Sequence, residues 1–357
     1  MSDRVPAVLR ALHRLRAPDP TPWSEGLSPA NARRCRDLAL DLITEAGLRQ
    51  AAAGLQGLPE EVALIAARGV YTAPLEWVAL LLAAGARVWI KAPGDAAEFL
   101  TALVAACAAE GLPARLGSGH RVPDSARGVV AFGSDDTTAA LRLAYPDRRL
   151  ALYGHRFSVA IWAPSGPVRA ADRAEAAAAL ALDHALYDTR GCMAPAAVWT
   201  TDDPAALSDA LATAMAEAER TLPRGVLHPS LGPLLRERLG LARVLGRVRA
   251  GEGWAVATLP ADRFLPVALP RVVTVIPAVD LEEIQAQLQP WAARLSAVGT
   301  QLTEGQLSLP GARVCPLGQM QTPAFPRAHD GRAMLSDLTD QASGAAGGND
   351  TGPRIPE

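Results

Sequence analysis

Lysine is almost missing from this 357-residue chain: of its 35 Lys and Arg residues, only Lys91 is a lysine. The compact ammonium of lysine and the planar guanidinium of arginine are different ligands. A lysine that survives so strong a preference for arginine marks a position where arginine does not serve, or is a surface residue kept by chance. Lys91 is therefore the first candidate for a functional residue.

Cysteine, aromatic residues and long apolar runs are also scarce. The four cysteines (Cys35, Cys107, Cys192 and Cys315) form no C-x-x-C pair, which argues against a disulfide framework or zinc knuckle and favours a cytoplasmic protein. With 4% aromatics and a net charge of -2, we expect no nucleic-acid partner. The longest uncharged apolar stretch, residues 77–86, falls short of the roughly 20 residues of a membrane span.

Several chemical motifs are missing as well. The sequence has neither G-x-G-x-x-G nor G-x-x-x-x-G-K-[ST], which disfavours an ordinary Rossmann dinucleotide site and a P-loop. It has no G-x-S-x-G for a serine nucleophile, and its histidines and carboxylates do not cluster at metal-ligand spacings. His184 and Asp188 read as a surface pair on a helix, and His329-Asp330-Gly331 as a compact polar turn. We therefore predict no metal site.

What is present is an alternation of strands and helices. Apolar residues make up 49% of the chain, enough for a sizeable core. We expect strands at residues 87–91, 128–132, 150–153, 158–161, 197–200 and 271–276, a β-prone run at 69–72, and helices at 75–84, 96–110, 170–188, 205–221 and 281–295. This alternation predicts βαβ units, a mostly parallel sheet and an α/β fold.

The chain divides into four parts by this pattern. We expect an N-terminal helical segment (1–50), a first α/β domain (51–187 and 301–338), a second α/β domain (188–300) and a disordered tail (339–357). Residues 307–320, within the 301–338 stretch, are expected to return as a strand to the first domain.

Candidate binding residues stand where predicted strands end. Lys91 closes one strand, and Phe132-Gly133-Ser134 closes another. Ligands of open α/β sheets bind at the carboxyl ends of strands. A glycine there lets a phosphate approach the backbone, and Ser134 with the following helix N-terminus offers anion-binding groups, although most such turns are only turns. We predict a ribose or phosphate contact for Lys91.

Cys192 is the candidate nucleophile, because it follows Gly191 where a helix breaks, while the other cysteines have more core-like surroundings. The thiolate is the reactive form, and Arg190 is close enough in sequence to stabilise it. The alternative is a packed, inert thiol.

Taken in order, short motifs resemble the aldehyde dehydrogenase superfamily, and more closely its acyl-CoA reductase (LuxC-type) branch. They are Y-T-A-P-L-E-W-V-A-L-L-L-A-A-G-A-R-V-W-I-K-A-P-G at 71–94, F-G-S at 132–134, L-Y-G-H-R-F-S at 152–158, R-G-C-M-A-P at 190–195, G-A-R-V-C-P-L-G-Q-M-Q-T-P at 311–323 and H-D-G at 329–331. The resemblance implies that the first α/β domain (51–187 and 301–338) is the dinucleotide-binding domain, that the second (188–300) is the catalytic domain, and that the active site lies in the cleft between them. It implies that Lys91 contacts the adenosine ribose, that Gly133 and Ser134 lie at the cofactor phosphates, and that Cys192 is the nucleophile.

Three positions depart from the family pattern. Leu152 stands where hydrolytic members have a glutamate base, Thr72 where many have an oxyanion-binding asparagine, and Gly94 where many NAD-using members have a glutamate. A glutamate at the position of Gly94 would repel a 2′-phosphate, so its absence, with Lys91 and either Arg87 or Arg121, favours NADPH.

The resulting expectation is NADPH-dependent reduction of an acyl-CoA, fatty or otherwise apolar, to the aldehyde. Cys192 would carry the acyl group, and its backbone N–H together with Thr72 would stabilise the oxyanion. The alternatives are a CoA-acylating or aldehyde-oxidising dehydrogenase, and a degenerate scaffold that binds a partner enzyme. Acyl-CoA is the expected partner; a homo-oligomer or an acyl-transferring partner enzyme stays open.

Overall fold

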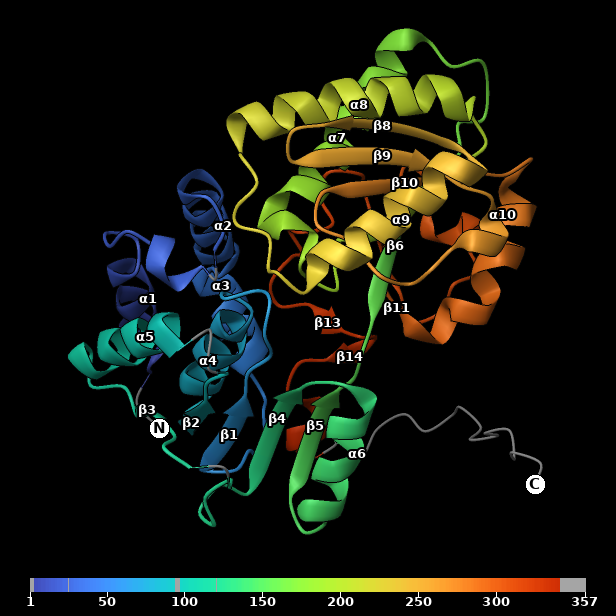
Figure 1. Cartoon of the computed structure of the whole chain (residues 1–357). Helices are drawn as coiled ribbons and strands as arrows, with labels where there is room; N and C mark the ends of the chain where they lie inside the picture. The colour runs from blue at the N-terminus through green and yellow to red at the C-terminus, as the bar shows by residue number, and fades with distance from the viewer. Residues whose placement is uncertain (1–2, 25, 94–96, 120, 341–357) are drawn as a thin grey trace.

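The computed structural model describes residues 3–24, 26–93, 97–119 and 121–340. Within them the chain forms a five-stranded and a seven-stranded sheet, with a two-stranded hairpin between the two (Figure 1). Helices cover both large sheets. This mixed α/β architecture, with sheets that are parallel except at one hairpin edge, confirms the predicted fold class.

The first sheet has the strand order β3-β2-β1-β4-β5 and is parallel throughout. Its strands are β1 (Glu61–Ile65), β2 (Arg87–Lys91), β3 (Ala114–Leu116), β4 (Gly128–Phe132) and β5 (Arg149–Tyr153). Their Val, Ile, Leu and Ala runs suit strands that are buried on both faces. The strand order reverses between β1 and β4, and the carboxyl ends beside such a reversal are where open α/β sheets bind ligands.

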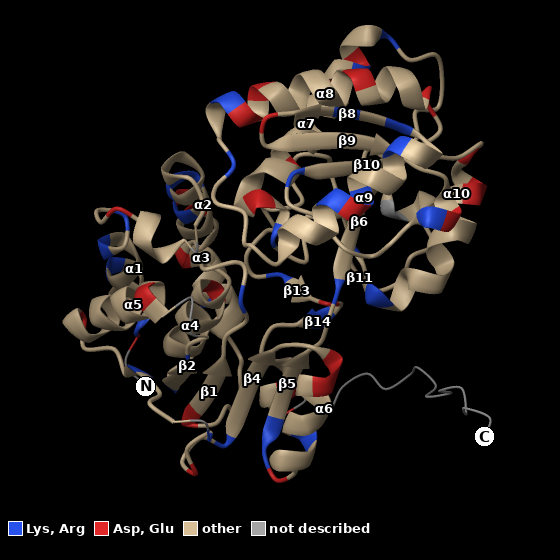
Figure 2. Cartoon of the chain, in the orientation of Figure 1, with Lys and Arg blue, Asp and Glu red and all other residues tan. Residues whose placement is uncertain are grey.

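The seven-stranded sheet has the order β12-β11-β6-β7-β10-β9-β8, with β8 antiparallel to β9. Its strands are β6 (Phe157–Trp162), β7 (Pro195–Thr200), β8 (Arg247–Gly251), β9 (Trp254–Thr258), β10 (Val272–Pro277), β11 (Leu295–Thr300) and β12 (Arg313–Cys315). Helices α7 (Ala170–Ala185) and α8 (Pro204–Thr221) cover one face, α10 (Leu281–Leu288) covers the other, and α9 (Leu231–Leu245) packs near β8 and β9. Figure 2 shows central strands such as β4 and β9 without charged residues.

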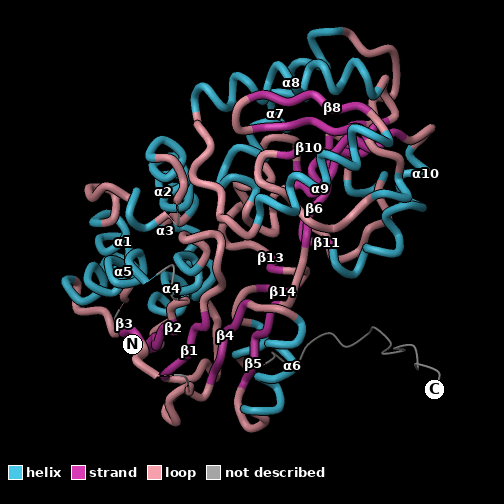
Figure 3. The backbone as a smooth tube through the Cα atoms, in the orientation of Figure 1, coloured by secondary structure: helices cyan, strands magenta, loops and turns pink. Residues whose placement is uncertain are grey.

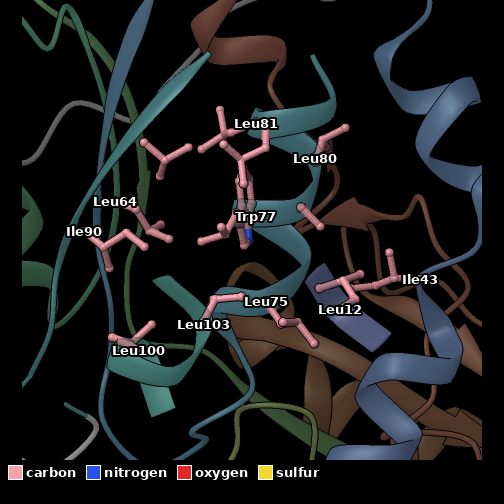
Figure 4. Close-up of a cluster of buried hydrophobic side chains, with 14 of the residues drawn as sticks. Leu12, Ile43, Leu64, Leu75, Trp77, Leu80, Leu81, Ile90, Leu100 and Leu103 are labelled. Carbon is pink, nitrogen blue, oxygen red and sulfur yellow. The ribbon is translucent and has the colours of Figure 1, made fainter. Parts of the chain in front are cut away.

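Helices enclose the first sheet from both sides (Figure 3). They are α1 (Val5–Arg14), α2 (Pro29–Leu42), α3 (Glu45–Ala52), α4 (Pro74–Ala83) and α5 (Ala97–Ala109) on one side and α6 (Asp135–Ala144) on the other. Trp77 of α4 is fully buried in the core with Leu64 and Ile90 of the sheet and Leu103 of α5 (Figure 4). Because α4 is apolar on nearly all sides, it belongs in this interior position.

The sequence predicts most of these elements correctly, but it misplaces the first strand. The structure has β1 at Glu61–Ile65, whereas the expected β-prone run at 69–72 forms no strand and leads into a turn at 71–73, in which the Ala73 N–H donates to the Val70 carbonyl at 3.0 Å. After Glu61, the run that forms β1 is continuously apolar. Periodicity alone does not separate such a run from a buried helix.

The expected return of residues 307–320 to the first sheet is wrong. β12 pairs in parallel with β11, inside the seven-stranded sheet. β6 also belongs to that sheet, so the chain changes sheets between β5 and β6 and not at residue 188. What returns to the first sheet is a later segment: Leu338 of η6 (Ser336–Leu338) is buried in its core. The division into domains by residue number stays a prediction.

The two ends of the chain carry different expectations, a helical segment at the N-terminus and a disordered tail at the C-terminus. The N-terminal segment is helical, as predicted, with α1, α2 and α3. Of the expected disordered tail, Asp340 is held in place by Arg149 at 2.5 Å, and residues 341–357 lie outside the described residues. No helix in the described part of the chain is long and apolar enough to cross a membrane.

Candidate active site

A cavity of about 1040 Å³ lies between the two large sheets. Its wall combines the loop after β1, Phe132 and Gly133 at the end of β4, Cys192 and the hairpin that carries Asp330. This volume is at the upper end of the range for ligand pockets. The cavity joins the reversal of the first sheet to a loop of the second, which is where the resemblance predicts the active site.

Cys192 is exposed in this cavity, whereas Cys35, Cys107 and Cys315 are buried. It lies in the Cys192 loop (residues 190–194), between η2 (Leu186–Thr189) and β7. The Ser158 hydroxyl donates to the Cys192 carbonyl at 2.7 Å and accepts from the Ala297 N–H at 3.0 Å. These two bonds fasten the loop to β6 and β11 of the seven-stranded sheet, so the thiol is held against a rigid element.

The groups around the Cys192 thiol shift its pKa in opposite directions. Although the Cys192 thiol opens onto the cavity, the protein around it withdraws it from bulk water, and this desolvation raises its pKa above the usual value. The Asp330 carboxylate raises it further, while the Arg327 guanidinium lowers it. The Ser296 hydroxyl of β11 lies 3.9 Å from the Cys192 Sγ and also favours the thiolate. Because thiolate is the nucleophilic form, Arg327 and Ser296 are the groups that support reactivity here.

Arg327 is itself held in place by Glu76 of α4. The Arg327 Nε donates to Glu76 Oε2 at 3.1 Å, and a second guanidinium nitrogen contacts Oε1. The two side chains are only 11% and 18% exposed. This bidentate pair joins the segment before β13 to helix α4. It also orients the Arg327 guanidinium, which lines the cavity.

The hairpin formed by β13 (Ala328–His329) and β14 (Arg332–Ala333) carries two more site residues. Asp330 sits at its turn with φ of 50° and contacts Arg156 at 3.5 Å. Burial raises the pKa of Asp330, against the influence of Arg156 and Arg327. His329 packs edge-on against Tyr153 with ring centres 4.3 Å apart, and burial lowers its pKa to about 2, so it is neutral.

The residues before the Cys192 loop have an unusual backbone. Tyr187, Asp188 and Thr189 have φ of 54°, 51° and 63°, a left-handed run without glycine. Such strain persists only where the surroundings enforce it. Asp188 is 1% exposed and accepts from Arg271 Nε at 2.8 Å and from Asn31 Nδ2 at 3.1 Å.

The expected surface pair of His184 with Asp188 is therefore wrong. Both side chains are buried, because α7 ends at Ala185 and the chain turns inward. Asp188 pairs with Arg271 instead, and no hydrogen-bond partner is found for either ring nitrogen of His184 among the described residues.

Three of the predicted cofactor residues, Lys91, Gly133 and Ser134, lie at the carboxyl ends of β2 and β4 in the first sheet. Lys91 ends β2 and lies opposite Ile65 at the carboxyl end of β1, although it does not line the cavity. Gly133 does line it, and Ser134 caps α6 by accepting from the Thr137 N–H at 3.2 Å. Gly94 lies outside the described residues. Arg87 starts β2, about 13 Å from Lys91 at strand spacing, so the expectation that it lies near Lys91 is wrong.

Two other residues that the sequence singles out, Thr72 and Leu152, lie in different surroundings. Thr72 lines the cavity, and its Oγ1 lies 2.7 Å from the Tyr187 hydroxyl, which donates to the Cys35 carbonyl at 3.1 Å. Leu152 packs with Ala63 and Val129 in the cluster beneath α6. It is not part of the cavity wall, because alternation along β5 turns its side chain to the opposite face from Tyr153.

Sequence reasoning missed Ser296, Arg327, Glu76 and Asp330 as a group around the thiol. They lie on β11, on the segment before the hairpin, on α4 and in the hairpin turn. No motif joins residues so distant in the sequence. The one usable signal was His329-Asp330-Gly331, because an aspartate before glycine in a short turn is suited to left-handed backbone.

Solved structures of aldehyde dehydrogenases have this fold. The γ-glutamyl-γ-aminobutyraldehyde dehydrogenase of Burkholderia cenocepacia J2315 aligns with a TM-score of 0.70 at 16% identity, over 94% of this chain and 81% of that one. The NAD-dependent benzaldehyde dehydrogenase of Corynebacterium glutamicum aligns with 0.64 at 16% identity, over 90% and 83%. The glyceraldehyde-3-phosphate dehydrogenase of Methanocaldococcus jannaschii, solved with NADP, aligns with 0.65 at 12% identity, over 88% and 81%. These likenesses confirm the predicted aldehyde-dehydrogenase-like fold.

Comparison at the sequence level identifies the branch. No curated protein matches the sequence. A family profile described as acyl-CoA reductase (LuxC) matches residues 120–341, more than half of the chain. The matched region contains Cys192, Ser296 and Asp330, and it leaves out Lys91 and Thr72. The chain therefore belongs to the acyl-CoA reductase (LuxC) family, and its chemistry is oxidation–reduction at the level of acyl-CoA and aldehyde.

Proposed function

We propose that the protein reduces an acyl-CoA thioester to the aldehyde with NADPH, through an acyl group carried on Cys192. The observation that carries this proposal is the exposure of Cys192 in a cavity that reaches the sheet reversal between β1 and β4. The thiol and the carboxyl ends of β1 and β4, where we expect the cofactor, thus face the same cavity. Cytoplasmic operation and a fatty or other apolar acyl group belong to the proposal.

In the first step the Cys192 thiolate attacks the thioester carbonyl carbon. A new carbon–sulfur bond forms and CoA leaves with its sulfur. Reduction of the resulting acyl-enzyme and collapse of the thiohemiacetal then release the aldehyde and restore the thiolate. The rigid attachment of the Cys192 loop through Ser158 fixes the geometry of this attack.

The oxyanion that forms on attack needs a donor. Tyr187 gives its single hydroxyl proton to the Cys35 carbonyl, so the Thr72 hydroxyl donates to Tyr187 and has no proton left. This arrangement argues against the expected role of Thr72. We assign the oxyanion to the Cys192 backbone N–H together with the Arg327 guanidinium, which lines the same cavity.

The residues at the first sheet suit a dinucleotide. The cavity reaches the carboxyl ends of β1 and β4, and a side chain on Gly133 would bring its Cβ to 2.9 Å from the Thr137 side chain, so glycine keeps this turn tight. Lys91 would hold the adenosine ribose or its 2′-phosphate, with Gly133 and Ser134 near the phosphates. When bound, the reduced nicotinamide supplies the hydride.

Mass spectrometry of the full chain after incubation with acyl-CoA tests this function. Without NADPH, we expect an acyl adduct on Cys192 and stoichiometric release of CoA. Addition of NADPH should discharge the adduct as aldehyde. An adduct on another cysteine, or aldehyde production by the Cys192→Ala variant, would refute the mechanism.

A further inference from the structure

Helix α2 has a wider apolar face than the core of the first sheet uses. Ala32 and Cys35 are buried in that core. Leu38, Ala39 and Leu42 are only half-buried, and they line the cavity. A surface helix of a globular protein usually has one apolar stripe toward the core and polar residues elsewhere. The additional aliphatic residues of α2 therefore give the cavity an apolar wall.

The chain between α8 and α9 gives the cavity a second apolar wall. Within residues 224–231, which we call the 224–231 loop, Val226, Leu227 and Leu231 line the cavity. Val226 is 75% exposed although its side chain is aliphatic. Because covering apolar surface with an apolar group is favourable in water, both walls suit an apolar ligand.

The two walls are fastened to one another at the start of α2, where Figure 1 shows the loop passing beside the helix. The Val226 N–H donates to the Gly26 carbonyl at 2.7 Å. A Cβ on Gly225 would lie 2.0 Å from that carbonyl oxygen, so the two backbones are in direct contact. The Gly225 N–H also donates to the Asp188 carboxylate at 3.0 Å, and Asn31 of α2 donates to the same carboxylate at 3.1 Å. The loop and the helix thus form one continuous surface.

The Cys192 loop adjoins this surface. The Arg190 Nη2 donates to the Val226 carbonyl at 3.4 Å. A Cβ on Gly191 would lie 3.0 Å from the Cγ2 of Val70, which also lines the cavity. A group bound to the Cys192 sulfur therefore has the 224–231 loop and Val70 in contact with the two residues before its attachment point.

We propose that α2 and the 224–231 loop bind the alkyl chain of an acyl group carried on Cys192, and that Ala39 and Leu42 determine which chain lengths fit. The inference rests on the proposed function, in which Cys192 forms the acyl-enzyme. Gly133, at the expected cofactor site, lines the same cavity but belongs to neither wall. Alkyl chain and cofactor thus have separate places, and the chain covers aliphatic surface that is otherwise exposed to water.

The α2 wall is held rigidly, which makes chain length a property of its side chains. The buried Tyr71 hydroxyl donates to the Ala32 carbonyl at 2.7 Å. The buried Tyr187 hydroxyl donates to the Cys35 carbonyl at 3.1 Å. Because both tyrosines fix the helix backbone, the helix does not retreat when a side chain grows. A larger residue in place of Ala39 therefore takes its volume from the cavity.

An acyl group with a carboxylate at its far end is the competing occupant. Arg224 and His228 of the 224–231 loop line the cavity and would favour such an anion. His228 is exposed, and its Nδ1 shares a hydrogen bond with the Ser230 hydroxyl at 2.7 Å. Aliphatic residues outnumber these two basic side chains over both walls, which favours the uncharged chain.

The test measures how fast Cys192 reacts with straight-chain alkyl methanethiosulfonates, from methyl to octyl, and needs neither acyl-CoA nor NADPH. Each rate is divided by the rate of the same reagent with glutathione, and mass spectrometry assigns the modified cysteine. For the wild type, we expect the ratio to rise by up to about fourfold for each added methylene that is buried. A ratio that does not rise with chain length overturns the proposal.

Variants of α2 decide whether this helix is the wall that the chain contacts. We expect Ala39→Leu to abolish the rise for the longer reagents and to leave the rate of the methyl reagent within about twofold. Ala30→Leu is the matched control, because Ala30 is half-buried on the same helix and lies outside the cavity wall. If Ala39→Leu does not fold, Leu42→Ala should extend the rise to longer chains. Profiles like that of the wild type in both variants, or an equal loss for methyl and octyl, would contradict the assignment.

A hexyl reagent that ends in a carboxylate tests the competing occupant. We expect it to react more slowly than the uncharged hexyl reagent, because a charge pays for leaving water. A faster reaction would assign these walls to a charged acyl group and overturn the proposal.

Release of CoA from acyl-CoA without NADPH connects the alkyl site to the function. We expect Ala39→Leu to raise the KM for long-chain acyl-CoA at least tenfold and to leave the value for acetyl-CoA nearly unchanged. If the wild type releases no CoA from any acyl-CoA, the proposed function fails, and the methanethiosulfonate profiles still decide whether the alkyl site exists.

Discussion

Arg327 is the single cation that favours ionisation of the Cys192 thiol, among the charged groups that act on it in the described structure. Because the guanidinium stabilises the thiolate, its removal should raise the pKa of Cys192. We expect Arg327→Gln to shift the pH profile of Cys192 alkylation by iodoacetamide to higher pH, so that the rate at pH 7 falls. Arg263→Gln, at an exposed arginine of η3 (Ala261–Arg263), should leave the profile where it is. A downward shift in Arg327→Gln would contradict this electrostatic assignment.

Lys91 is the one lysine of the sequence, and it lies at the carboxyl end of β2 in the first sheet. If its ammonium contacts an anionic ribose phosphate, Lys91→Met should lower kcat/KM for NADPH about tenfold, as expected for loss of a hydrogen bond to a charged group. The value for NADH should change less. Steady-state kinetics with both cofactors measure this ratio, and an equal loss for both would show that Lys91 does not read the 2′-phosphate.

The η2 turn depends on one buried ion pair. Arg271 and Asp188 are 0% and 1% exposed, and Asp188 also accepts from Asn31 of α2 and from the Gly225 N–H at 3.0 Å. Breaking a buried pair by removal of one partner leaves an uncompensated charge. We expect Arg271→Met to lower the free energy of unfolding by about 3–5 kcal/mol in denaturant titration. Arg249→Met, which breaks the exposed pair with Asp209, should cost less than about 1 kcal/mol. Similar losses in the two variants would refute the importance of burial.

Among the strands and helices, the sequence predicts those features that neighbouring residues determine, such as where a helix begins and ends. Helix α4 is predicted because Pro74 and Gly85 bracket an apolar run, and Gly85 has the left-handed φ of 95° that a helix end uses. β12 is three residues long, and its pairing with β11 follows from the order of strands in space, which periodicity does not contain. The site divides in the same way. Cys192 and Gly133 stand at breaks visible in the sequence, whereas Ser296 and Arg327 acquire their meaning through contacts made by folding.

For the whole molecule, buried neutral histidine links folding to pH. Burial lowers the pKa of His184 from 6.5 to about 3. The unfolded chain therefore binds one more proton than the folded chain between these values, and the stability contributed by neutral His184 is lost as the pH falls through that window. The expected slope is about 1.4 kcal/mol per pH unit. The difference in unfolding free energy between wild type and His184→Leu, measured from pH 6.5 to 4, should show it. His13→Gln, at an exposed histidine, should show no such slope.

The candidate site draws its thiol from the middle of the chain and its carboxylate from near the end, and this spacing has a meaning in time. A ribosome adds about 5–20 residues per second, so the 138 residues from Cys192 to Asp330 correspond to roughly 7 to 28 s of translation. During that interval the growing chain contains the cysteine but lacks Arg327, the cation that favours its thiolate, and the hairpin that completes the cavity wall. The surroundings of Cys192 are therefore complete only when synthesis approaches residue 330, and the last segments to emerge supply them.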